Sequence, residues 1–277
     1  MKTTWRFAFL FVLAPLLARA SGGPGQDPPS KGVAEQVKAI GDNYKSKEEE
    51  LDKKLDKATK EKAIAKLEKA LDKLFEDTCA KYLEISRKNA KDPDIFPALE
   101  FLLSAGVENA EKAFAIVVDN HVESKPVGKL CLTLVDGAEA APVSSGPSME
   151  KVERLARAVI EKNRHDEAKG PATLALARIV LQRSENGRDR DALRKEAEAL
   201  LTSVVEKYPA SEFTPWGAEE GRTRKVGDVA KATLFEFRNL ATGLAAPEIE
   251  SEDLAGKEFK LSGLRGKVVL LHFWRFS

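Results

Sequence analysis

Two cysteines and three histidines are the residues of this chain best suited to act as nucleophiles, redox groups or metal ligands. Cys79 and Cys131 are far apart in the sequence, and their spacing matches no metal-binding or C-x-x-C redox motif. In an oxidising compartment they could form one structural disulfide. Both also lie in helical, partly apolar sequence, where an unpaired cysteine behaves as a small buried hydrophobe. A Cys79–Cys131 disulfide and two buried thiols therefore both remain open.

The histidines do not form a metal-binding pattern. His121, His165 and His272 have no H-x-x-x-H spacing, and His165 precedes Asp166, a residue type that often caps a helix. No G-x-S-x-G, P-loop or G-x-G-x-x-G sequence occurs. The arginine-rich stretch 183–194 mixes both charges and contains a turn sequence, so we interpret it as a loop and not a phosphate site. We therefore expect no catalytic residue, no cofactor and no metal site in this sequence.

Composition favours a helical protein with a sizeable core. Alanine, leucine, lysine and glutamate dominate, 43% of residues are hydrophobic, and only 7% are aromatic. The 45 Lys and Arg residues nearly balance the 44 Asp and Glu residues. A dedicated nucleic-acid surface needs a positive face, so we expect no nucleic-acid partner.

The N-terminus has the three parts of a secretory signal peptide. Lys2 and Arg6 are positive, residues 7–17 form a short apolar run, and Ala18-Arg19-Ala20 fits a cleavage site. The run is too short for a stable membrane span. We expect cleavage and export to the periplasm or the medium, with no membrane contact afterwards; an uncleaved anchor is the alternative.

The helical part begins with a long amphipathic pattern. From Lys45, leucine, isoleucine and alanine recur at steps of three and four for thirty residues or more, until Asp92-Pro93 ends the helix. This pattern fits either a coiled-coil seam or one long helix packed on its own domain, and a break between Ala58 and Ile64 favours the second. Shorter helices are predicted over residues 94–104, 107–121, 125–135, 149–163, 166–183, 191–207 and 226–242.

Three of these helices share a weak repeat. Residues 110–121, 152–163 and 197–208 each have glutamate in second place, then a hydrophobic pair, then an acidic residue. The offsets have the length of a helix-hairpin repeat. Residues 168–208 look most like a tetratricopeptide-type unit, because small residues in its first helix allow close approach. The sequence therefore predicts an α-helical hairpin array, whose concave surface could bind a protein or peptide partner.

Beyond residue 243 the pattern changes from helix to strand. Residues 257–261 alternate polar and apolar side chains, as a half-buried strand does, after a tight turn over 254–257. Residues 267–274 then form an almost continuous apolar run, which is typical of a central strand covered on both faces.

Residues 244–274 closely resemble the N-terminal part of the redoxin family, the AhpC/TSA and TlpA-like thiol–disulfide oxidoreductases. Ala246 to Ile249 fit the A-P-x-[FI] start of that family, and Asp253 to Lys257 fit its D-x-x-G-K turn. Leu261 to Lys267 match the segment before its strand, and Phe273-Trp274 close the match. The helical region also resembles the helical N-terminal part of some exported bacterial redoxins.

The resemblance implies a thioredoxin-like α/β domain that is truncated here. The family follows F-W with about three residues and then C-x-x-C, whose first cysteine is the nucleophile at a helix N-terminus. Here Arg275-Phe276-Ser277 follow and the sequence ends. None of the family's catalytic residues can be assigned, and we expect this sequence to lack redoxin activity. A thiol or disulfide substrate is expected only for a complete redoxin domain, and without one the run 267–274 would be an exposed aggregation hazard.

These observations predict a mainly α protein with a helical-hairpin, tetratricopeptide-like array followed by the first strands of a thioredoxin-like domain. The predicted parts are a signal peptide (1–20), a flexible linker (21–32), the helical domain (33–242) and the redoxin fragment (244–277). The leading interpretation of function is an exported redoxin of the thiol–disulfide oxidoreductase or antioxidant type. The alternative is a helical-repeat binding module without enzymatic activity.

Overall fold

The computed structural model of the 277-residue chain describes most of the sequence after residue 31. The described ranges are residues 32–140, 146–186, 189–215, 218, 222–240, 243–253 and 255–273. The predicted signal peptide and nearly all of the predicted linker lie outside them. None of the described helices is long and apolar enough to cross a membrane. The chain forms two compact units, Met1–Lys231 and Ala232–Ser277, which are described separately.

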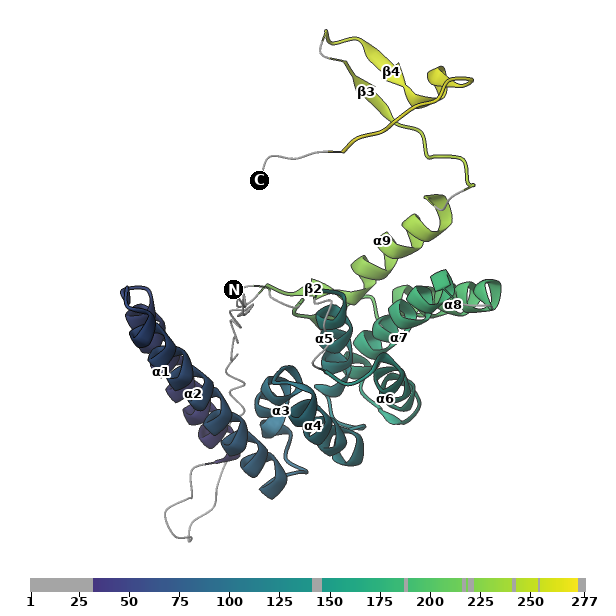
Figure 1. Ribbon diagram of the computed structural model, residues 1–277. Helices are drawn as coiled ribbons and strands as arrows, with labels where there is room; N and C mark the ends of the chain where they lie inside the picture. The colour runs from purple at the N-terminus through teal and green to yellow at the C-terminus, as the bar shows by residue number, and fades with distance from the viewer. Residues whose placement is uncertain are drawn as a thin grey trace. The chain divides into compact units, whose positions relative to one another are not determined.

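The predicted mainly α fold is confirmed, with only a few short strands (Figure 1). The helices are α1 (Val33–Leu55), α2 (Glu61–Lys88), α3 (Phe96–Ser104), α4 (Val107–Asn120), α5 (Val127–Ala140), α6 (Met149–Lys162), α7 (Asp166–Asn186), α8 (Arg190–Lys207) and α9 (Val226–Asn239). The strands are β1 (Glu212–Phe213), β2 (Arg224–Lys225), β3 (Glu250–Glu252) and β4 (Glu258–Lys260).

The predicted single long helix from Lys45 is wrong. The structure has two helices here, α1 and α2, which pack side by side as a hairpin with a turn between Leu55 and Glu61 (Figure 1). The break in the apolar pattern between Ala58 and Ile64 marks this turn. Packing explains why two helices form and not one. In a hairpin the leucine-rich faces of α1 and α2 cover each other, whereas one straight helix would leave the apolar face of its far half exposed to water.

The helix α3 forms the centre of the first part of the core. The helix α2 ends at Lys88, four residues before the predicted stop at Asp92-Pro93; Asp92 instead caps the short 3-10 turn Pro93–Ile95, and its Oδ1 accepts a hydrogen bond of 2.9 Å from Asp94 N. Most of α3 is buried against α2 and α4. The Phe101 ring lies 5.1–5.6 Å, between ring centroids, from three other aromatic rings, those of Tyr44, Phe75 and Tyr82.

The helices α5 to α8 form the hairpin array. The repeated segments 110–121, 152–163 and 197–208 lie on α4, α6 and α8, and the predicted tetratricopeptide-type unit corresponds to α7 packed on α8. The central helix α7 is buried on nearly all sides over residues 171–177. Its contact with α5 is close, because a Cβ on Gly128 would lie 1.8 Å from the carbonyl oxygen of Ala168.

Two boundary predictions differ from the structure. The helix α5 extends to Ala140, five residues beyond the predicted end at residue 135; residues 141–145 lie outside the described ranges. Stretch 183–194, interpreted as a loop, is helical up to Asn186 and again from Arg190, and residues 187–188 lie outside the described ranges. Favourable i,i+4 backbone bonding and the packing of α7 on α8 outweigh the turn-forming residues in these two helices.

The second unit, Ala232–Ser277, contains the end of α9 and a β-hairpin. The strands β3 and β4 pair antiparallel, with Ser251 opposite Phe259. The predicted strand at 257–261 is thus present as β4, but its residues are exposed and not half-buried. Residues 267–273 form no strand, contrary to the prediction, and no described strand pairs with them. Their side chains are exposed, Val268 completely so. An apolar run becomes a central strand only when neighbouring strands satisfy its backbone.

Candidate functional site

The two cysteines are on different helices and are free thiols. Cys79 lies on α2 and Cys131 on α5, and both are buried. Burial raises the pKa of the Cys79 thiol to about 11 and that of Cys131 to about 12. Since the thiolate is the reactive form, neither cysteine is suited to nucleophilic or redox chemistry near neutral pH.

The histidines are held in three separate places. His121 ends α4, is buried with its Nδ1 3.0 Å from Ser124 Oγ, and its ring meets Phe96 edge-on. Burial lowers its pKa, although the backbone of Ala90 and the charge of Asp92 oppose the shift. His272 lies in the exposed C-terminal run.

The remaining histidine does not behave as predicted at its helix start. His165 precedes α7, and its backbone N donates to Asn163 Oδ1 at 2.9 Å. Asp166 is the first residue of α7 and not the cap before it, since the carbonyl of His165 already accepts the first helical bond, from Ala168 N. No described group of three or more His, Cys, Asp or Glu residues could hold a metal ion.

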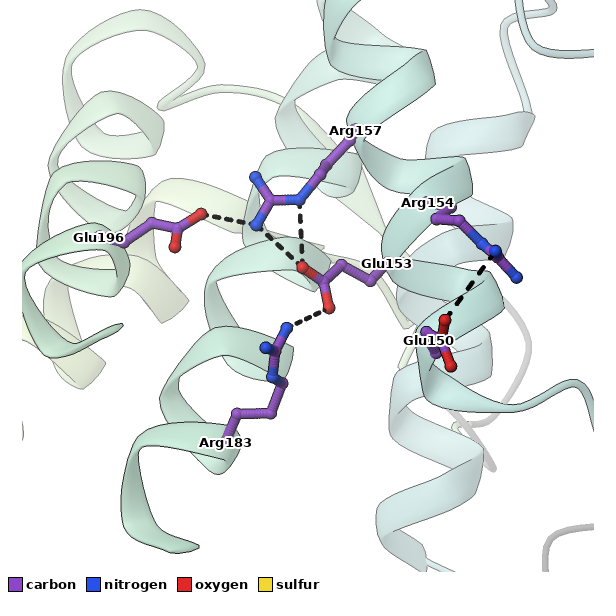
Figure 2. Close-up of polar contacts among 6 residues, drawn as sticks. All are labelled: Glu150, Glu153, Arg154, Arg157, Arg183 and Glu196. Carbon is purple, nitrogen blue, oxygen red and sulfur yellow. Dashed lines mark hydrogen bonds and ion pairs between the residues drawn. The ribbon is translucent and has the colours of Figure 1, made fainter. Parts of the chain in front are cut away.

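The most organised polar cluster joins α6, α7 and α8, and the sequence reasoning missed it. It contains Glu153 and Arg157 on α6, Arg183 on α7 and Glu196 on α8 (Figure 2). From the sequence alone, Arg183 is expected to lie in a loop, and nothing marks Glu153 or Glu196 as different from other acidic residues on helix surfaces. Only the i,i+4 spacing of Glu153 and Arg157 was visible as a signal in the sequence.

Glu153 is the centre of this cluster. Its Oε1 accepts hydrogen bonds from Arg157 Nε at 3.1 Å and Nη2 at 2.9 Å, and its Oε2 accepts one from Arg183 Nη1 at 2.6 Å. Arg157 Nη2 also reaches Glu196 Oε1 at 2.6 Å (Figure 2). The Glu153 side chain is only 11% exposed, whereas those of Arg157 and Arg183 are 46% and 55% exposed. The nearly buried Glu153 carboxylate thus ties α6 to α7, and Arg157 extends the cluster to α8 through Glu196.

The ion pairs of this cluster have a structural role. Guanidinium groups stay protonated at any physiological pH, so they cannot act as acids or bases. Partial burial of Arg157 is outweighed by its bonds to Glu196 and Glu153, and its pKa is raised further. The carboxylate has both oxygens occupied by these donors. The arrangement therefore fastens helices and offers no free group for catalysis.

A second cluster fastens α5 to α7. Arg178 on α7 forms ion pairs with Asp136 and Glu139 on α5, and its side chain is 20% exposed. Its partners lie 42 and 39 residues earlier in the chain. The bond of Arg157 to Glu196 spans a similar 39 residues. Polar contacts therefore follow the repeat length that the sequence indicates, joining equivalent helices of successive hairpins.

The turn between β3 and β4 has a well-defined geometry. Asp253 Oδ1 accepts hydrogen bonds from Ala255 N at 2.8 Å and from Lys257 N at 3.0 Å. Gly256 has a φ of +76°, a backbone conformation that favours glycine. At the other end of the hairpin, Glu248 Oε1 accepts a hydrogen bond of 2.9 Å from Ser262 N, and bonding from the side chain and the backbone of Ser262 lowers the pKa of Glu248.

Comparison with known proteins gave no similar protein. No family model matches the chain, no curated protein matches it, and no solved structure matches it.

Proposed function

We propose that this chain is an exported redoxin-type thiol–disulfide oxidoreductase in which a helical-hairpin array precedes the redoxin part. The proposal rests on the resemblance of residues 244–274 to the redoxin family. On this proposal the thiolate belongs to the family's C-x-x-C, which by register would follow position 277, and no residue of this sequence takes its role.

The observation that supports the proposal most is the geometry of the β3–β4 hairpin. Three positions that carry the resemblance have defined structural roles there. Asp253 binds the backbone of the turn, Gly256 adopts the positive φ that the turn needs, and Ser262 is bonded to Glu248. If these residue types are present because the chain forms the redoxin hairpin, they are expected to have structural roles in that hairpin.

The properties of the two cysteines agree with this assignment. Both thiols are buried in the helical unit and have raised pKa values. Redox chemistry based on them would need a lowered pKa and access to a substrate. These properties support the proposal that the redox chemistry belongs to the redoxin part and not to the array.

Reading the genomic sequence across and beyond codon 277 is the first test. We expect codons for a C-x-x-C a few positions after Phe273-Trp274, in this frame or in a shifted one. A chain extended through that motif should reduce the disulfides of insulin with dithiothreitol as electron donor, and its Cys-to-Ser variant should not. A genuine stop codon with no C-x-x-C downstream in any frame would contradict the proposal.

Export is tested separately. Mass spectrometry of the protein recovered from the periplasm or medium should give a mature N-terminus at Ser21. An intact Met1 on protein that stays in the cytoplasm would rule out the export part of the proposal and leave the oxidoreductase part unaffected.

A second candidate function, a helical protein-binding module, is favoured by the array itself. Polar contacts at the repeat spacing join its successive hairpins, which is the organisation of solenoids that bind proteins or peptides. Removing residues 244–277 separates the two candidates. A binding module should keep its helical fold and its binding of a protein or peptide partner, whereas a redoxin would lose the only part tied to redox chemistry.

A further inference from the structure

The helices of the first unit fall into two packed groups. Helices α1 to α4 pack on one another, and α5 to α8 pack on one another. Among the described residues, no helix of the first group packs extensively on a helix of the second. The chain passes from one group to the other once, through residues 121–126 between α4 and α5.

This connection is anchored at both of its sides. On the first side, His121 is fully buried, and its ring lies against Phe96 with 5.0 Å between the ring centroids. On the second side, Asn163 follows α6, is nearly fully buried, and donates from Nδ2 to the carbonyl oxygens of Val122 and Ser124, each at 2.9 Å. Because adjacent residues of this connection are bound to the two groups, His121 to the first and Val122 to the second, the connection is a well-defined pivot between them.

Away from the pivot, an ion pair bridges the two groups. Lys151 Nζ on α6 lies 2.5 Å from Glu111 Oε2 on α4, and the two side chains are 37% and 42% exposed. Arg164 lies 4.0 Å from Glu123 beside the pivot. Exposed ion pairs contribute little to stability and are weakened by salt, unlike apolar packing.

We propose that α1–α4 and α5–α8 are two bodies joined by a hinge at residues 121–126, and that the Glu111–Lys151 ion pair is the latch that holds them closed. The two bodies move apart along the edge between α4 and α6 when this ion pair is screened by salt or removed by mutation. Within each body the helices stay in place, because apolar packing and the Glu153 cluster hold them.

Spin-label distance measurements on the full chain test this. Exposed Ala80 on α2 and Ala199 on α8 are replaced by cysteine and labelled, in a background with Cys79→Ala and Cys131→Ala. Glu111→Gln removes the latch. The matched control is Glu108→Gln, which removes an ion pair with Lys112 that lies within α4, at 2.6 Å.

We expect Glu111→Gln to broaden the distance distribution roughly twofold, since an exposed ion pair holds the bodies by little more than thermal energy. Raising NaCl from about 0.05 M to 0.5 M, which shortens the screening length from roughly 14 Å to 4 Å, should broaden the unsubstituted distribution in the same way. Glu108→Gln should behave as the unsubstituted chain. Identical distributions for the Glu111 and Glu108 variants, with no response to salt, would overturn the proposal.

A second variant keeps the test independent of the labelled background. Asn163→Ala releases the pivot from the second body, so in the chain with its native cysteines we expect faster amide hydrogen exchange over residues 122–126. Circular dichroism must show an intact helical fold. Unchanged exchange in a folded Asn163→Ala chain would show that Asn163 does not secure the pivot, and would overturn the hinge.

Discussion

Replacing Glu153 with glutamine should destabilise the helical unit by more than its exposure alone suggests. The Glu153 carboxylate accepts three hydrogen bonds from two guanidinium groups, at 2.6–3.1 Å, and is only 11% exposed (Figure 2). Glutamine has the same shape but no charge, and its amide NH₂ turns one acceptor into a donor that faces an arginine. The variant therefore costs one of the two arginines its hydrogen bonds to residue 153, although Arg157 keeps its bond to Glu196.

The size of the effect follows from burial. Hydrogen bonds to charged groups contribute about 1.5–3 kcal/mol each, whereas exposed ion pairs contribute about 0.2–1 kcal/mol. Arg157 and Arg183 are roughly half exposed and can turn to water, so the loss should lie between these limits. We expect Glu153→Gln to lower the free energy of unfolding by about 1–2 kcal/mol.

Urea denaturation followed by circular dichroism at the helical band measures this free energy. The matched control is Glu150→Gln on the same helix, because Glu150 is 79% exposed and lies 3.9 Å from Arg154. We expect the control to change stability by less than about 0.5 kcal/mol. A double-mutant cycle with Arg183→Ala should give a positive coupling energy. Equal stability of the Glu153 and Glu150 variants would refute the structural role of the cluster.

Three further predictions follow from single positions. Gly128→Ala should destabilise the protein by about 1–3 kcal/mol in thermal or urea unfolding, because the new Cβ would meet the Ala168 backbone. This loss should outweigh the better helix propensity of alanine. Adding Ala168→Gly should give no rescue, since the clash is with the backbone, and a stabilised Gly128→Ala variant would refute the close contact. Burial raises the pKa of Glu100 to about 7, so between pH 4.5 and 7 it ionises mainly in the unfolded chain and stability falls as pH rises. Glu100→Gln should therefore stabilise the protein at pH 8, on the order of 2 kcal/mol, and have little effect at pH 4, as urea midpoints would show; equal effects at both pH values would contradict this. Cys79 and Cys131 should not react with Ellman's reagent in the native chain and should give two thiols after unfolding; no thiols after unfolding would show a disulfide instead.

Much of the helical organisation could be predicted because it depends on neighbours in the chain. The 3.6-residue apolar period located α4, α6, α7 and α8 to within a few residues. Asp92-Pro93 marked the boundary between α2 and the next helical segment to within a few residues, because proline restricts the backbone locally. The weak repeat of 42 and 45 residues likewise indicated which helices are equivalent.

The charged cluster could not be predicted, because its members come from three helices. Glu153 and Glu150 lie one helical turn apart on α6 and have the same side chain, yet one is nearly buried and the other is exposed. Only the packing of α7 against α6, which places Arg183 beside Glu153, distinguishes them. Arg183 was assigned to a loop for the same reason, as its helix is stabilised by the neighbouring helices.

By itself, the sequence determined where helices form, where most of them end, and that residues 253–257 make a turn, since backbone sterics and local periodicity decide these features. The tertiary structure decided that the first long pattern folds back as α1 and α2, that the cluster around Glu153 joins three helices, and that residues 267–273 remain unpaired. Each of these depends on which surfaces are covered by distant parts of the chain. Burial sets the strength of an ion pair, the pKa of a thiol and the pairing of a strand, and burial is a property of the fold and not of the local sequence.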